Sequence, residues 1–259
     1  MITSRKILSA EKTPIGAWDI STATFSQSFT LQENSGGVFF KPDGTKMYNT
    51  TGNEDFIDEY NLSVAWDIST ASYFQSFNSS TFSADGIFFK PDGTKMYLAT
   101  NNQVDEYDLS VAWDISTASY VQNLSGFNEI DSLQDVFFKP DGTKMYVSGF
   151  AGGVDGSGGI SEYNLSVAWD ISTASYLQNA VGATVSNCFF RFDGEKMYLT
   201  FNDGFLQEYD LSVAWDISSL SSVNLLPDLD PGPDIFFKPD GTKMYLADGN
   251  QVDEYELGL

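Results

Sequence analysis

The chain of 259 residues contains no histidine and only one cysteine. Histidine is the commonest transition-metal ligand and the usual general base, so we expect neither a zinc site nor a histidine-dependent catalytic triad. A lone cysteine forms no disulfide within its own chain and no thiolate metal cluster. Cys188 directly precedes a Phe-Phe pair, where equivalent segments carry valine or isoleucine. We therefore expect it to be a buried apolar residue.

Basic residues are also scarce, because 13 lysines and arginines stand against 36 aspartates and glutamates and leave a net charge of −23. Nucleic acids and anionic membrane surfaces attract proteins with a positive footprint, so both are excluded as partners. We find no apolar run long enough to span a bilayer or to act as a signal peptide. We expect a soluble monomer made in the cytoplasm, whose release by cell lysis would need no signal.

A ten-residue segment, FFKPDGTKMY, occurs four times, at Phe39–Tyr48, Phe88–Tyr97, Phe137–Tyr146 and Phe236–Tyr245. A fifth copy at Phe189–Tyr198 carries Arg-Phe in place of Lys-Pro and Glu195 in place of threonine. The tryptophans of an AWDI motif recur at spacings of 48, 47, 56 and 46 residues, at Trp18, Trp66, Trp113, Trp169 and Trp215. A period of about 40 to 50 residues in a strand-rich unit is typical of a β-propeller.

Each repeat contains four predicted strands, called A to D below. In one repeat, the apolar segment Gly86–Lys90 and the segment Thr94–Thr100 flank a Pro-Asp-Gly turn, in which proline sets φ and glycine allows a positive φ. Gln103–Leu109 and Ala118–Leu124 follow as strands C and D. No segment has a convincing helical periodicity. The pattern predicts an all-β fold built from four-stranded blades.

The two ends of the chain each lack part of a blade. Thr22–Phe29 is predicted to be a strand D with no strand A to C before it, and the blade within Ile235–Leu257 ends at strand C. We predict that Thr22–Phe29 completes this last blade, which gives a single five-bladed propeller over residues 17–259 without a free edge. Residues 1–16 form an N-terminal tail with the pattern of a decayed strand C, and Pro14 makes it a weak competitor for that place.

The register FFKPDGTKMYLAT…VDEYD resembles the repeats of YVTN-type and related PDG propellers over nearly the whole chain after Gly16. This resemblance implies the propeller fold and says little about function. The longer pattern VAWDISTASYVQ…FFKPDGTKMY is similar to near-identical tandem repeats of phage and uncultured marine virus proteins. That similarity implies a viral origin, an accessory or adhesive role and association with a virion.

The repeats vary on one face only. In a propeller the A–B turns and C–D connections lie on one face, here nearly invariant, and the B–C and D–A loops lie on the other, where the repeats differ in length and composition. We interpret this variable face as one asymmetric binding surface, with drift of loop tips as the alternative. The residues expected to bind a ligand there are Asp85, Asp135, Asn187, Asp234, and, from the long loop Phe150–Gly159, Phe150 and Asp155.

Two further sets of residues are candidates for binding. Asp135 and Asp234 at strand A would suit a hard cation such as Ca²⁺, and solvated strand-entry residues are the simpler alternative. The five AWDI tryptophans could each stack on a sugar ring, but packing between blades, with the next aspartate capping a turn, is the interpretation we favour. The repeated glutamates are expected to pair across strands with repeat lysines such as Lys46 and Lys95.

These observations predict a non-enzymatic binding or adhesion module that recognises a glycan or a surface protein. A scaffolding propeller without a ligand is the first alternative. A five-bladed glycosidase is the second, and it would need unique acids in the channel, for which Asp85, Asp135 and Asp234 are the candidates.

Overall fold

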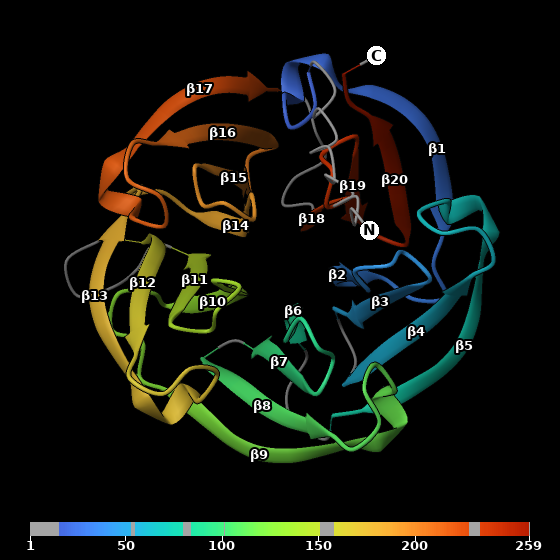
Figure 1. The fold of residues 1–259 in the computed structure, drawn as a ribbon, viewed down its shortest axis with the longest axis horizontal. Coiled ribbons are helices and arrows are strands. Elements are labelled where there is room, and N and C mark those ends of the chain that lie inside the picture. The colour runs from blue at the N-terminus through green and yellow to red at the C-terminus, as the bar shows by residue number, and fades with distance from the viewer. Residues whose placement is uncertain are drawn as a thin grey trace, which may run out of the picture.

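The computed structural model of the chain describes residues 16–52, 55–79, 84–100, 102–150, 158–227 and 234–258. Within these ranges the strands form five four-stranded antiparallel sheets around a central axis (Figure 1). The predicted all-β, five-bladed β-propeller is confirmed. In the described ranges the helices are three-residue 3-10 turns, and none could cross a membrane.

Four blades each come from one continuous stretch of chain, with strand A at the axis and strand D at the rim (Figure 1). Blade 1 comprises β2 (Ser35–Phe40), β3 (Lys46–Thr51), β4 (Phe56–Leu62) and β5 (Ala71–Asn78). Blade 2 comprises β6 (Ala84–Phe89), β7 (Lys95–Thr100), β8 (Gln103–Leu109) and β9 (Ala118–Ser125). Blade 3 comprises β10 (Ser132–Phe138), β11 (Lys144–Phe150), β12 (Gly159–Leu165) and β13 (Ala174–Ala180). Blade 4 comprises β14 (Val185–Phe190), β15 (Lys196–Phe201), β16 (Phe205–Leu211) and β17 (Leu220–Leu226).

Blade 5 joins the two ends of the chain. It contains β18 (Asp234–Phe237), β19 (Lys243–Asp248) and β20 (Gln251–Glu256), and β1 (Thr24–Thr30) is its outer strand. β1 pairs antiparallel with β20, with Phe29 opposite Val252, and Figure 1 shows the blue β1 outside the red β20. The predicted closure is therefore correct. Of the predicted N-terminal tail, residues 1–16, all but Gly16 lies outside the described residues, so its strand C pattern stays a prediction.

The closing strand begins at Thr24, two residues later than the sequence suggested, because Ile20–Thr22 form the 3-10 turn η1. Asp19 caps this turn by accepting a hydrogen bond of 3.0 Å from the Ser21 amide. The same capped turn follows the other four AWDI tryptophans as η2 (Ile68–Thr70), η3 (Ile115–Thr117), η4 (Ile171–Thr173) and η5 (Ile217–Ser219). The expected role of the AWDI aspartates as turn caps is therefore confirmed.

Each Pro-Asp-Gly turn packs on the tryptophan of its own blade. In blade 2 the Asp92 carboxylate accepts hydrogen bonds from the Thr94 amide at 3.0 Å and from the Thr94 hydroxyl at 2.6 Å. Gly93 has a φ of 73°, and a Cβ at this position would overlap the indole ring of Trp113. The amide of Trp113 donates to the carbonyl oxygen of Gly93 at 3.1 Å. The invariance of these segments thus has a packing cause.

A repeated polar network joins each blade to the next. In blade 2 the buried Glu106 carboxylate pairs with Lys95 and accepts a hydrogen bond of 2.9 Å from Gln122. Gln122 also donates at 3.0 Å to Asp170, which belongs to blade 3. The predicted glutamate–lysine pairing across strands B and C occurs in all five blades, with Glu59, Glu106, Glu162, Glu208 and Glu254. This network ties strands B, C and D of one blade to the C–D connection of the next.

Candidate binding site at the central axis

Five phenylalanine side chains meet at the central axis. They are the first members of the Phe-Phe pairs on strand A, and neighbouring rings lie nearly edge to face with centroids 5.1, 5.2, 5.4, 5.5 and 5.6 Å apart. We call this set the phenylalanine ring: Phe39, Phe88, Phe137, Phe189 and Phe236. Its contacts run from blade to blade around the full circle, so it separates the axial space on the variable face from the axial space on the regular face.

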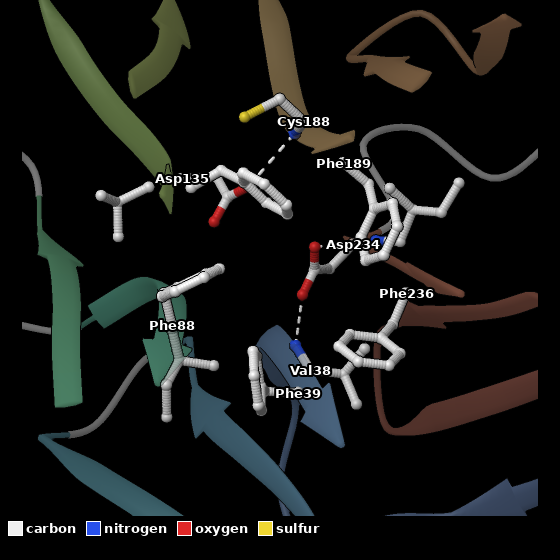
Figure 2. A pocket seen from close by; sticks show the side chains of 12 residues that line it. Val38, Phe39, Phe88, Asp135, Cys188, Phe189, Asp234 and Phe236 are labelled. Carbon is white, nitrogen blue, oxygen red and sulfur yellow. Dashed lines mark hydrogen bonds between the residues drawn. The ribbon is translucent and has the colours of Figure 1, made fainter. Parts of the chain in front are cut away.

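On the side of the variable face, strand A adds two more layers to the axis. The layer next to the phenylalanine ring is apolar and contains Val38, Ile87, Val136, Cys188 and Ile235. Cys188 is buried, as its position in the repeat predicted. The following layer contains Gly37, Gly86, Asp135, Asn187 and Asp234. A cavity of about 20 Å³, bordered by Asp135 and Asp234, lies at the axis in these layers (Figure 2).

Asp135 and Asp234 turn inward and each accepts a hydrogen bond from the main chain of the following blade (Figure 2). Asp135 Oδ2 accepts from the Cys188 amide at 3.1 Å, and Asp234 Oδ2 accepts from the Val38 amide. Gly86 and Gly37 provide the space, because a Cβ on Gly86 would collide with Asp135 and a Cβ on Gly37 would lie 3.2 Å from Asp234 Oδ2. The two carboxylates thus connect blades, and the two glycines make room for them.

Burial raises the pKa of both carboxyl groups. The pKa of Asp135 rises from 3.8 to about 7, because desolvation outweighs the hydrogen bonds from the Cys188 and Val136 amides. Desolvation also raises the pKa of Asp234 well above its usual range, and the charge of Asp135 raises it further. Since two like charges in a dry site are costly, the pair retains a proton at neutral pH.

The surroundings of the pair can be compared with the oxygen ligands that a calcium ion needs. Calcium takes about six to eight oxygen ligands. In the described part of the chain, no group of three or more His, Cys, Asp or Glu side chains is placed to hold a metal ion. Asp135 and Asp234 already accept main-chain hydrogen bonds, and the adjoining cavity of about 20 Å³ has room for about one water molecule. Calcium binding at this pair stays a prediction from the sequence.

A polar cavity of about 290 Å³ opens on the variable face, where strands A begin. Its lining comes from several blades, and we call it the polar mouth: Asn34, Ser35, Gly36, Gly52, Asp85, Gln134, Asn187 and Gly249. Asp85 is half-buried at its edge, and desolvation raises the pKa of this carboxyl group from 3.8 to about 6. The mouth therefore offers carboxamide, hydroxyl and carboxyl groups in a partly enclosed space.

The structure separates the residues that the sequence placed together on the variable face. Asp85 and the buried Asn187 line the polar mouth, whereas Asp135 and Asp234, which are in the same layer as Asn187, are not among its lining residues. Phe150 ends β11 opposite Ser132 and is not part of the mouth, and Asp155 lies outside the described residues. Asn34, Ser35, Gly52 and Gly249 also line the mouth and were not among the residues predicted to bind a ligand. Their position in the sequence could have identified them, because they lie at the D–A loop and at the end of strand B, where the other residues of the variable face also lie.

The five tryptophans line the interior of the other face. Four are at most 9% exposed and Trp113 is half-buried. Their φ values of 65° to 69° place these bulky residues in the left-handed region, where only dense surroundings hold them. Besides the glycine of its turn, Trp66 stacks on Phe40 with centroids 5.7 Å apart. These contacts support packing, and they leave the indole faces covered rather than open to a sugar.

Comparisons with known proteins concern the fold. The chain matches no protein-family model and no curated protein. Among solved structures it is similar to the β-propeller domain of Cps50 (Swd1) from Myceliophteria thermophila, with 9% identity and a TM-score of 0.49. The match covers 86% of this chain and 65% of that chain, which is less than two thirds of the latter. The sheet topology itself defines the class of protein as a five-bladed β-propeller.

Proposed function

We propose that this propeller is a non-enzymatic binding module that takes the terminal sugar of a glycan in the polar mouth. The observation that carries the proposal is the mouth itself, a cavity of about 290 Å³ whose polar side chains come from different blades. Ligand pockets begin at about 300 Å³, so this space suits one small polar group. Sugar hydroxyls both donate and accept hydrogen bonds, as do the carboxamides of Gln134 and Asn187.

Binding without catalysis agrees with the placement of the acids. Glycoside hydrolysis uses two carboxyl groups on either side of the scissile bond. Asp85 is the one carboxyl group among the described residues that line the mouth. Asp135 and Asp234 are not among its lining residues; they are 6% and 5% exposed and accept hydrogen bonds from main-chain amides. Within the described part of the chain, a substrate in the mouth would therefore meet one acid where hydrolysis needs two.

We further propose that this binding serves adhesion to a glycosylated surface, in keeping with the resemblance to phage and marine virus repeats. The nearly invariant repeats build the frame and the loops around the mouth differ from blade to blade. Such a division is what recognition by a single asymmetric site requires. It gives one ligand site per chain rather than five equivalent ones.

A glycan array tests the proposal, with the full chain run once in calcium and once in EDTA. We expect a restricted set of glycans to bind, and the variants Asp85→Asn and Gln134→Ala to weaken binding at least tenfold. Asp92→Asn, an exposed position in a turn of the regular face, serves as the control and should leave binding unchanged. Absence of glycan binding in both buffers, or equal binding by all three variants, would reject a sugar site in the mouth.

A further inference from the structure

The regular face has a second axial cavity, which the phenylalanine ring separates from the polar mouth. Its volume is about 330 Å³, and every described residue that lines it is a phenylalanine or a proline. The phenylalanine ring forms the inner end, and Pro42, Pro91, Pro140 and Pro239 contribute to the wall together with Phe192. We call this cavity the apolar funnel. It exists because four Phe-Phe-Lys-Pro segments and the Phe-Phe-Arg-Phe segment of blade 4 converge on one axis.

Phe192 gives the funnel one side that differs from the rest. It replaces the proline found in the other four turns, and its side chain is 45% exposed. Its ring meets Trp18 edge to face with centroids 6.4 Å apart. A hollow of about 480 Å³ adjoins it, lined in part by Trp18, Arg191 and Pro239. The apolar funnel therefore continues at blade 4 into this adjoining hollow.

The charges around the funnel are paired in a similar way in every blade, and in blade 4 Arg191 also contacts Glu195 at 2.8 Å. The cation that precedes each turn proline, or Phe192 in blade 4, binds the aspartate of its own turn at 2.7 to 2.8 Å. These pairs are Lys41–Asp43, Lys90–Asp92, Lys139–Asp141, Arg191–Asp193 and Lys238–Asp240. Among the described residues, every cation of these turns is paired, so the rim offers no free cation to an anionic ligand. Four of the pairs neutralise themselves, and the turn of blade 4 carries one acid more than it has bases.

We propose that the apolar funnel is a second binding site, specific for a neutral apolar small molecule such as an aromatic ring compound. Water in a space lined only by phenylalanine and proline side chains makes few hydrogen bonds, so an apolar ligand replaces it favourably. The volume of about 330 Å³ suits a ligand of two or three fused or linked rings. A second copy of the chain is the less favoured occupant, since two chains of net charge −23 repel each other.

Fluorescence of the neutral dye N-phenyl-1-naphthylamine tests this site in the full chain. We expect saturable binding of one dye per chain. Pro140→Asp and Pro91→Asp place a charge on the wall from two different blades, and each should weaken binding at least tenfold. Phe192→Pro restores the common turn sequence and should weaken binding about threefold, because it removes one aromatic wall. Using two aspartate variants keeps the test valid if one of them fails to fold.

Two controls distinguish the funnel from other apolar surface and from the polar mouth. Phe74→Ser removes an aromatic side chain that is 56% exposed on the rim strand β5, outside the funnel. Asp85→Asn alters the mouth. Both should keep the dye affinity of the unaltered chain. The proposal is overturned by non-saturable binding, by loss of binding in Phe74→Ser, by unchanged binding in both aspartate variants, or by sedimentation showing that the face is covered by a second copy.

Discussion

The hydroxyl group of Tyr97 in blade 2 donates a hydrogen bond of 2.7 Å to the main-chain carbonyl oxygen of Trp169 in blade 3. The same bond links each other pair of neighbouring blades, through Tyr48, Tyr146, Tyr198 and Tyr245. Trp169 has a left-handed backbone conformation, with a φ of 67°, and its carbonyl oxygen faces the neighbouring blade. A tyrosine that looks like core filling in the sequence is therefore also a connection between blades.

Tyr97→Phe tests this connection. The variant retains the buried ring and removes the hydroxyl group, which leaves the Trp169 carbonyl oxygen without this donor, so we expect a loss of about 1 to 2 kcal/mol in the free energy of unfolding. Urea denaturation measures it. Tyr73→Phe is the matched control, because Tyr73 is 46% exposed on strand D, and it should change stability by less than about 0.5 kcal/mol. Equal effects of the two substitutions would contradict the assignment.

Gly93→Ala tests the contact between turn and tryptophan. Alanine at this position has to adopt a φ of 73° and places its Cβ against the Trp113 indole. Gly126→Ala imposes similar backbone strain at a φ of 86° but has nothing within 4 Å of the added Cβ. We expect about 1 kcal/mol of destabilisation at Gly126 and at least about 3 kcal/mol at Gly93, measured by thermal denaturation. A similar loss of stability in both variants would mean that the Trp113 indole moves aside without an energetic penalty.

The glutamate–lysine pairs differ between blades in a way that can be measured. Lys95 contacts both Glu106 and Asp108, whereas Glu162 is the only carboxylate paired with Lys144 among the described residues. Removing one member of a buried pair leaves the other uncompensated. We expect Glu162→Gln to cost about 3 kcal/mol in unfolding free energy and Glu106→Gln about half of that. Chemical denaturation of both variants decides it, and an equal or reversed order would count against the explanation.

The raised pKa of Asp135 predicts that the protein loses stability as the pH rises. Its folded pKa of about 7 lies above its ordinary value of 3.8, so between these two pH values the unfolded chain releases a proton that the folded chain retains. The contribution is complete below about pH 4 and disappears as the pH rises through about 7. Asp234 acts in the same direction. Melting temperatures measured from pH 4.5 to pH 8.5 should therefore decline.

Asp135→Asn should flatten that decline, because the amide does not titrate. Asp92→Asn is the control of opposite sign: its carboxyl pKa is lowered to about 2, so this substitution should matter in acid and leave the slope above pH 5 unchanged. A slope in Asp135→Asn as steep as that of the unaltered chain would show that other groups cause it.

Calcium removal gives a separate test of the buried pair. Because the two carboxylates already bind main-chain amides and retain a proton, we expect 5 mM calcium to shift the melting temperature no more than 5 mM magnesium does. The double variant Asp135→Asn, Asp234→Asn is the reference. A calcium-specific stabilisation that this double variant abolishes would establish the ion site that the sequence suggested.

Blade number, ring closure and the sorting of loops onto two faces were predictable from the sequence, because they depend on local chemistry repeated five times. The Pro-Asp-Gly turn is set by adjacent residues, as the bond from Asp92 to Thr94 shows, and each strand pairs with its neighbour in sequence. The first strand D and the last three strands are together one blade, so the pairing of β1 with β20 completes it.

The candidate sites depended on contacts between blades, which the repeat pattern does not encode. Asp135 and Asp234 appeared to belong to the same surface as Asp85, yet the tertiary structure buries them against the Cys188 and Val38 amides. The sequence by itself therefore determined the propeller, since turns and neighbouring strands are short-range. Only the tertiary structure decided where the polar mouth and the apolar funnel lie, because five side chains converge at the axis only when the ring closes.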